Sequence, residues 1–114
     1  MPLLSSSPDL KAIQEYVRQL EFERGFDGNT VQQTCLLLGE EIGELFKAVR
    51  KQQKMRLDQK SSVGTVEEEL ADILIYICSI ANRLDIELEQ AFRDKEELNK
   101  QRAWVSRPDA EKTV

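Results

Sequence analysis

The sequence predicts an all-α fold in which four helices form a compact bundle. Helix start and stop signals recur along the 114 residues, whereas the alternating patterns of strands are nearly absent. Apolar residues make up 40% and charged residues 32% of the chain, which excludes a disordered chain and a membrane protein. We expect one domain over residues 1–114, with its core at about 8–104 and a loose polar tail at 105–114.

The first helix is predicted to begin with Ser7 as N-cap and Pro8 at the first helical position, and to end near Arg24. Its buried face follows helical spacing and consists of Leu10, Ile13, Val17 and Leu20. Two glycines in the segment 25–29 then break the helix.

Three further helices follow. The second runs over about 30–55 and ends in basic residues, which suit the negative end of a helix dipole. Thr65-Val66-Glu67-Glu68 is a capping box, so the third helix begins there and ends near Arg83. Asp85 is the predicted cap of a fourth helix over about 86–104.

Two carboxylate pairs with a three-residue spacing lie on the second and third predicted helices: Glu41/Glu44 and Glu69/Asp72. Glu41 projects inside the edge of one apolar stripe, and Glu69 lies on the margin of the other. A single pair is most simply explained by a solvated helix face, because acidic side chains are nearly always exposed. Two pairs on stripe margins make a converging cluster an equal alternative to a solvated face, and such a cluster needs a cation to offset the burial of its charge. Oxygen-only ligands point to Mg²⁺, with Mn²⁺ as a substitute.

The order of these motifs resembles the MazG-like, all-α nucleoside triphosphate pyrophosphohydrolases. Glu40 and Glu41 followed by Glu44 match the first motif of that family, EExxE, and Glu69 with Asp72 matches the second, ExxD. The resemblance implies that the Mg²⁺ ligands are Glu41, Glu44, Glu69 and Asp72. It spans roughly residues 22–104.

A weaker third motif lies downstream. Lys95, Asn99 and Arg102 follow the pattern K-x-x-x-N-x-x-R, which is seen on the last helix of the deoxycytidine triphosphate pyrophosphatase branch of that family. Their spacing puts them on one helical face, so they either bind phosphate or form a solvated helix end.

Four more residues are candidates for substrate binding, each with an ordinary structural alternative. Lys47 and Lys51 continue the face of Glu44 and would hold the departing pyrophosphate, or they pair with Glu44 and the helix dipole. The hydroxyl of Tyr76 would reach a phosphate or a ligand carboxylate, unless the side chain serves the core or an interface. Phe26 would stack on a base, or it anchors its glycine-rich turn.

Composition excludes several other classes of function. The chain has no histidine, which rules out a His-based triad and a conventional zinc site. Its net charge of −5 argues against general nucleic-acid binding.

Cys35 and Cys78 are both expected to be small buried residues in a reducing compartment. No apolar run is long enough to span a bilayer, and the first residues lack a secretory signal, so we expect a cytoplasmic protein without a membrane partner.

The expected reaction is Mg²⁺-dependent hydrolysis of a nucleoside triphosphate, with Glu40 or Glu41 accepting the proton of the attacking water. Phosphoribosyl-ATP is the alternative substrate, and a non-enzymatic helical dimerisation or adaptor module is the alternative class. The third helix is apolar around much of its circumference, which predicts a homodimer or a dimer of dimers. The resemblance implies the same association. The base, the sugar and the number of metal ions stay open.

Overall fold

The secondary structure of the described part of the chain consists of four α-helices. In a computed structural model, the described residues are 2–56 and 62–102, and the helices are α1 (Leu10–Arg24), α2 (Val31–Gln52), α3 (Val66–Arg83) and α4 (Leu88–Lys100). These residues contain no strand, so the prediction of an all-α fold with four helices is confirmed. The tail predicted at 105–114 lies outside the described residues. None of the helices in the described ranges is long and apolar enough to cross a membrane.

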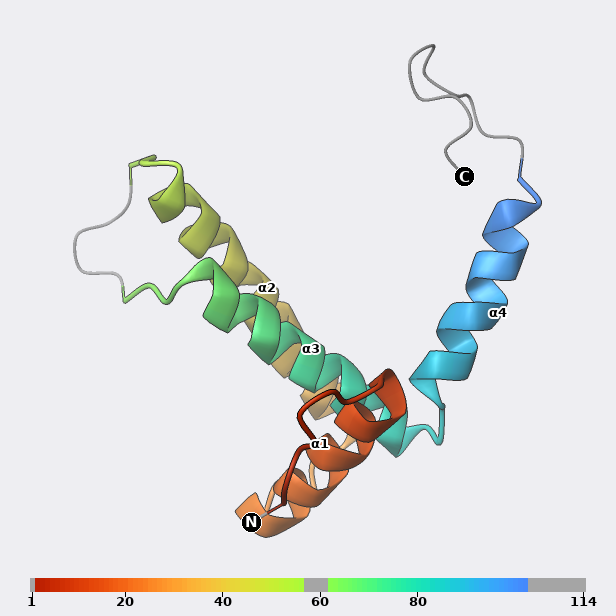
Figure 1. Cartoon of the computed structure of the whole chain (residues 1–114). Coiled ribbons are helices and arrows are strands. Elements are labelled where there is room, and N and C mark those ends of the chain that lie inside the picture. The colour runs from red at the N-terminus through yellow and green to blue at the C-terminus, as the bar shows by residue number, and fades with distance from the viewer. Residues whose placement is uncertain (1, 57–61, 103–114) are drawn as a thin grey trace.

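The long helices α2 and α3 lie side by side and run antiparallel (Figure 1). The helix α1 packs across α3 near the C-terminal end of α3, and α4 contacts α1 and leads away from the α2–α3 pair (Figure 1). The first three helices therefore form the main body, and α4 extends from it as an arm.

A small core lies between α1 and α3. Its fully buried members are Val17, Leu20 and Cys78, and the partly buried side chains packed around them are Ile13, Tyr16, Ile75 and Leu88. Val17 and Leu20 belong to the predicted apolar face of α1, which is thereby confirmed. Cys78 is buried as predicted, whereas Cys35 is exposed on α2, so the prediction of its burial was wrong. Helical spacing locates an apolar stripe but does not say which part of it a neighbouring helix covers.

Capping boxes fix the starts of α2 and α3. Thr65 accepts a hydrogen bond from the backbone of Glu68 at 3.1 Å, and the Glu68 side chain accepts one from the Thr65 backbone at 2.9 Å, as predicted. Thr30 and Gln33 form the same reciprocal pair at 3.0 and 2.9 Å. Both boxes satisfy backbone N–H groups that have no partner within the helix.

The starts of α1 and α4 differ from the prediction. Asp9, not Ser7, is the N-cap of α1, because its carboxylate accepts the N–H of Ala12 at 2.8 Å. Asp85 does not cap α4; it adopts a left-handed conformation with φ 55°, and the helix begins three residues later at Leu88. The predicted end of α4 near residue 104 is also too late, since the helix ends at Lys100.

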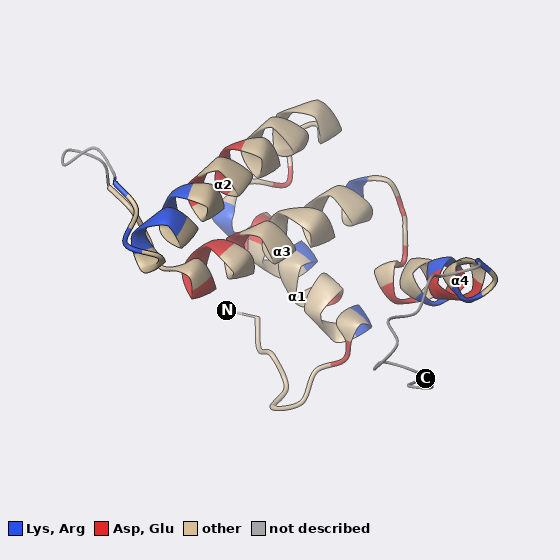
Figure 2. Ribbon diagram, turned by 90° about the horizontal axis from the view of Figure 1, so that it is seen from above, with Lys and Arg blue, Asp and Glu red and all other residues tan. Residues whose placement is uncertain are grey.

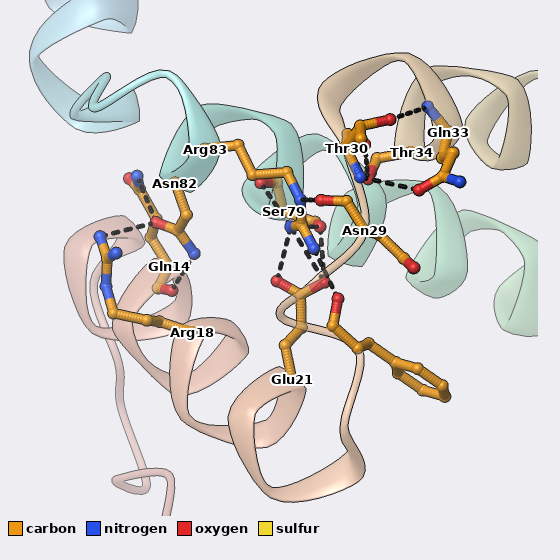
Figure 3. Close-up of polar contacts among 11 residues, drawn as sticks. Gln14, Arg18, Glu21, Asn29, Thr30, Gln33, Thr34, Ser79, Asn82 and Arg83 are labelled. Carbon is orange, nitrogen blue, oxygen red and sulfur yellow. Dashed lines mark hydrogen bonds and ion pairs between the residues drawn. The ribbon is translucent and has the colours of Figure 1, made fainter.

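A glutamine from α1 takes the place of a local cap on α4. The side-chain oxygen of Gln14 accepts the N–H of Leu88 at 3.0 Å, and the side-chain amide nitrogen of Gln14 donates to the side-chain oxygen of Asn82 at 2.9 Å and to the Ile86 carbonyl at 2.6 Å. The side-chain amide of Asn82 donates back to the backbone carbonyl of Gln14 at 3.1 Å. Gln14 thus joins α1, α3 and α4, as the close-up in Figure 3 shows for its bonds with Asn82.

Candidate metal centre

Three carboxylates converge between α2 and α3. Glu41 comes from α2, and Glu69 and Asp72 come from α3; each offers an oxygen, and these oxygens lie within 4.8 Å of one another. Glu69 is only 7% exposed, Glu41 is half-buried and Asp72 is exposed. Figure 2 shows acidic residues on both helices of the pair. The cluster therefore combines a buried wall with an open side, and its donors are oxygens only, as hard divalent cations require.

The local sequence explains how α3 presents this cluster. The capping box at Thr65 fixes the first turn, and the N–H of Glu69 donates to the Thr65 carbonyl at 3.1 Å, so Glu69 is held one turn into the helix. Asp72 follows on the same face after three residues. The backbone N–H of Thr65 bonds to Glu68 and holds the pKa of that carboxyl below its usual value. Glu68 therefore stays ionised as a cap, and Glu69 and Asp72 remain available for the cluster.

Burial, together with the neighbouring carboxylates, changes the protonation of Glu41. Partial burial raises the pKa of Glu41 to about 7, assisted by a hydrogen bond with Glu69 and by the negative charges of Asp72, Glu69 and Glu44. Near neutral pH the cluster therefore keeps a proton unless a cation compensates its negative charge. A divalent ion would supply that compensation, so the residues fit a metal.

Tyr76 lies beside the acidic cluster, one turn after Asp72. Burial raises the pKa of its hydroxyl, and so do the nearby charges of Glu41, Asp72, Glu40 and Glu21, in that order. The hydroxyl therefore keeps its proton at neutral pH and can donate a hydrogen bond to an oxygen of a ligand.

Glu44 stands apart from the three converging carboxylates. Its side chain pairs with Lys47 at 3.7 Å, while its charge still contributes to the raised pKa of Glu41. Lys51 is exposed one turn after Lys47, where basic residues gather at the end of α2 (Figure 2).

The three residues of the predicted third motif lie away from the cluster within one chain. Lys95 and Asn99 are on α4 and Arg102 lies just beyond it, and α4 leads away from the α2–α3 pair (Figure 1). The Asn99 amide donates to Glu96 at 3.1 Å, and Lys95 and Arg102 are exposed.

A separate cavity of about 250 Å³ lies next to Tyr76, where the turn between α1 and α2 meets the main body. Its lining mixes carboxylate, amide, hydroxyl, aromatic and aliphatic side chains and consists of Glu21, Phe26, Asn29, Thr34, Leu37 and Tyr76. Tyr76 contributes to this cavity and lies under the electrostatic influence of the acidic cluster, so the two features are neighbours.

Comparison with known protein families identifies the fold and the motifs together. The model of the MazG nucleotide pyrophosphohydrolase domain matches residues 29–103, which is more than half of the chain. The chain belongs to the MazG family. The match supports nucleotide pyrophosphohydrolase activity in general, and the family depends on divalent metal ions. A search of curated proteins gave no significant match.

The MazG match includes both acidic motifs but begins after α1. Glu21 and Phe26, two lining residues of the cavity, therefore come from outside the matched range. Sequence reasoning named Phe26 but missed Glu21, which is 9% exposed and lies four residues after Val17 on the buried face of α1. That helical spacing from a core residue was the available signal.

Arg83 is another residue of this region that sequence reasoning missed. It was interpreted only as the end of the third helix, yet its guanidinium pairs with Glu21 at 3.0 Å, and both side chains are 11% exposed. Ser79, one turn before Arg83, donates its hydroxyl to Glu21 at 2.7 Å (Figure 3). The sequence holds no local signal for this network, because Glu21 and Arg83 come from different helices.

Proposed function

We propose that this protein hydrolyses a nucleoside triphosphate, in the presence of Mg²⁺, to the monophosphate and pyrophosphate. The observation that carries the proposal is the convergence of Glu41, Glu69 and Asp72 between α2 and α3 in a chain that belongs to the MazG family. A deoxynucleotide is the preferred substrate class, following the resemblance of Lys95, Asn99 and Arg102 to the third motif of the deoxycytidine triphosphate branch.

Glu41, Glu69 and Asp72 would hold the metal, with Glu44 as the fourth ligand. When bound, Mg²⁺ or Mn²⁺ would neutralise phosphate charge and lower the pKa of an attacking water. Glu44 supports this assignment through its charge effect on Glu41, and turning away from Lys47 would free its carboxylate. Surface ion pairs of this kind contribute only about 0–1 kcal/mol, so the turn costs little.

The proton of the water would pass to a carboxylate of the first motif. Glu40 is exposed immediately beside Glu41 and lies outside the three converging carboxylates, so it could accept the proton while Glu41 holds the metal; Glu41 is the alternative. Separate Glu40→Gln and Glu41→Gln variants distinguish the two. Loss of turnover with intact metal affinity in Glu40→Gln would assign the base to Glu40, and retained turnover in that variant would leave Glu41 as the base.

Basic and polar side chains of α2 and α3 would bind the rest of the nucleotide. Lys47 and Lys51 would bind the departing pyrophosphate from the end of α2, and Tyr76 would donate its hydroxyl to a phosphate oxygen. The cavity beside Tyr76 would take the base, with Phe26 as the stacking residue. Its volume of about 250 Å³ is below the range of roughly 300–1,000 Å³ that drug-sized ligands occupy, so it suits one part of a nucleotide.

We also propose that the working unit is a homodimer. Apolar side chains on the outer faces of α2 and α3 are exposed in the single chain, among them Phe46 at 63% and Leu70 at 52%. The other exposed members of these faces are Ile42, Val49, Leu74 and Ile77. A second copy of the chain is the occupant that suits such faces, because the one buried core is small and closed symmetric dimers are the commonest oligomers.

A nucleotide panel tests the proposed activity. Pyrophosphate release is measured from ribo- and deoxynucleoside triphosphates and from phosphoribosyl-ATP, with Mg²⁺ and with EDTA. We expect release from at least one triphosphate with Mg²⁺ and none with EDTA. Turnover of phosphoribosyl-ATP alone would assign the alternative substrate, and no turnover of any compound would support a non-enzymatic adaptor.

Alanine variants of Glu41, Glu44, Glu69 and Asp72 connect that activity to the cluster. We expect each to lose about 10²-fold or more of its Mg²⁺-dependent turnover while circular dichroism stays helical. Glu67→Ala is the matched control, because Glu67 is an exposed acid of the same first turn outside the cluster. Full activity in two or more of the four variants would contradict the metal site.

A further inference from the structure

We infer that Arg83 is a positioning residue for the nucleobase, because it holds the turn between α1 and α2 that forms one wall of the cavity beside the acidic cluster. The inference rests on the proposed function. Arg83 itself does not line the cavity; it acts through residues that do.

The guanidinium binds the backbone of the turn at two places. Its Nε donates to the Asn29 carbonyl at 2.7 Å, and its Nη2 donates to the Phe26 carbonyl at 2.7 Å. Asn29 and Phe26 are both lining residues. Figure 3 shows Arg83 extending from the end of α3 toward Asn29 and Glu21. One side chain therefore fixes two points of the wall relative to α3.

The same guanidinium also holds Glu21, a third lining residue. Its Nη1 donates to the two carboxylate oxygens of Glu21 at 3.0 and 3.2 Å and to the Ser79 hydroxyl at 2.6 Å. An arginine suits this position because its planar fork of donors can serve carbonyl and carboxylate partners at once. Lysine would supply the charge but not the fork.

Neutralising Glu21 also matters for the ligand. Glu21 is close enough to Tyr76 to contribute to the raised pKa of its hydroxyl, and Tyr76 in turn borders the acidic cluster. An unpaired carboxylate at this wall would repel the phosphates of a bound nucleotide. Paired with Arg83, the wall presents a neutral, shaped surface that suits an uncharged base.

The α1–α2 turn has few other anchors among the described contacts. Gly25 adopts the left-handed conformation with φ 76° and ends α1, and the N–H of Asn29 donates to the Phe26 carbonyl at 3.1 Å. These bonds shape the turn internally. Arg83 is the residue that connects it to α3, so its replacement should loosen the base-binding wall and leave the metal ligands in place.

The experiment compares Arg83→Lys with wild type on two substrates. One is the best nucleoside triphosphate of the panel, and the other is deoxyribose 5′-triphosphate, which lacks a base. We expect KM for the nucleotide to rise about ten- to a hundredfold with kcat nearly unchanged, because a small misplacement of a binding wall has effects of this size. KM for the base-free compound and the affinity for Mg²⁺ alone should stay within about twofold.

A second measurement does not depend on activity. Amide hydrogen exchange should accelerate in residues 25–30 of Arg83→Lys and stay unchanged in α2 and in the first turns of α3. Arg93→Lys is the matched control, because Arg93 forms an exposed ion pair with Glu89 at 3.3 Å and has no contact with the turn. We expect it to match wild type in every measurement.

The outcomes separate the two proposals. Suppose that wild type cleaves nucleotides and that Arg83→Lys raises KM equally for the nucleotide and the base-free compound, or raises neither. The positioning role is then overturned, and the proposed function stands. If wild type cleaves nothing, both fall. If Arg83→Lys does not fold, the double variant Glu21→Gln/Arg83→Gln is used instead, because it removes both charges and leaves neither one buried without a partner. It should show the same selective rise in KM, and an unchanged KM for the nucleotide would overturn the inference.

Discussion

Gly64 lies directly against the carboxylate of Glu69: a Cβ atom at residue 64 would be 2.7 Å from Oε2 of Glu69. We expect Gly64→Ala to displace that carboxylate and weaken the binding of Mg²⁺ or Mn²⁺ by about 10- to 100-fold, because the residues that orient metal ligands commonly have effects of this size. Calorimetric titration of the nucleotide-free protein measures the change.

The matched control for this substitution is Gly28→Ala. A Cβ atom at Gly28 would meet no atom within 4 Å, and the residue does not have a positive φ. Its affinity for the metal should equal that of wild type. Equal affinity in Gly64→Ala would show that Glu69 has room to move and that the close approach does not constrain it.

The raised pKa of Glu41 predicts how the stability of the metal-free protein depends on pH. Burial and the hydrogen bond with Glu69 raise this pKa from 4.5 to about 7, so between these values the folded protein binds more protons than the unfolded chain. The free energy of unfolding should therefore fall as the pH rises from about 5 to about 8 in EDTA. Thermal denaturation across that range measures it.

Glu41→Gln provides the control, since an amide does not titrate. The pH dependence assigned to this carboxyl should disappear, and the variant should be more stable than wild type near pH 8, where wild type carries the full repulsion. In wild type, affinity for Mg²⁺ should increase over the same range because binding releases the proton. A stability curve with the same slope in both proteins would contradict the assignment.

The exposed apolar faces of α2 and α3 predict self-association. Leu74→Lys places a charge on the outer face of α3 and should convert the protein into a smaller species, or unfold it, because a small core leaves little stability to spare. Light scattering during size-exclusion chromatography measures the mass. Leu3→Lys is the control, since Leu3 is 92% exposed near the N-terminus, away from that face. A folded wild-type monomer of 13.1 kDa would contradict the dimer.

The position of α4 predicts that two chains share one active site. Arg102 follows the end of α4, which leads away from the α2–α3 pair, so we expect it to reach a phosphate at the site of a second copy. Arg102→Ala should then lower catalytic efficiency about 10²- to 10³-fold, as the loss of one preorganised donor does. Metal binding without nucleotide should not change.

Mixing two inactive variants tests this arrangement. After unfolding and refolding together, Arg102→Ala and Glu69→Ala should form mixed dimers in which one of the two sites is intact, which restores about a quarter of wild-type activity. A mixture as inactive as its components would exclude sharing. Wild-type catalytic efficiency in Arg102→Ala would show that Arg102 is only a solvated residue at a helix end.

Patterns of residues close in sequence predicted where the helices lie but not which helices pack against one another. The capping box at Thr65 and the apolar face containing Val17 and Leu20 depend on residues close in sequence, and both are present as predicted. The exposure of Cys35 and the capping of α4 by Gln14 depend on which helix lies next to which, and spacing within one helix carries no such information.

The same distinction separates the residues of the candidate site that were predicted from those that were not. Glu41, Glu69 and Asp72 were predicted because their positions on stripe margins conflict with an ordinary apolar face, and the fold brings them together. Arg83 and Glu21 were not predicted, because their pairing bridges α3 and α1 and only the folded chain creates it. The pairing of Glu44 with Lys47 was likewise not decided by the sequence, because helical spacing permits both this ion pair and convergence on the other carboxylates.

The bond from Leu88 to Gln14 also has a consequence for the order of folding. A helix of 13 residues is marginal by itself in water, and the first turn of α4 has no side-chain cap of its own. It should form only after α1 has docked on α3 and brought Gln14 and Asn82 together. Among the four helices, the one that carries Lys95 and Asn99 should then be the last to fold, and its direction depends on a residue 74 positions before its first residue.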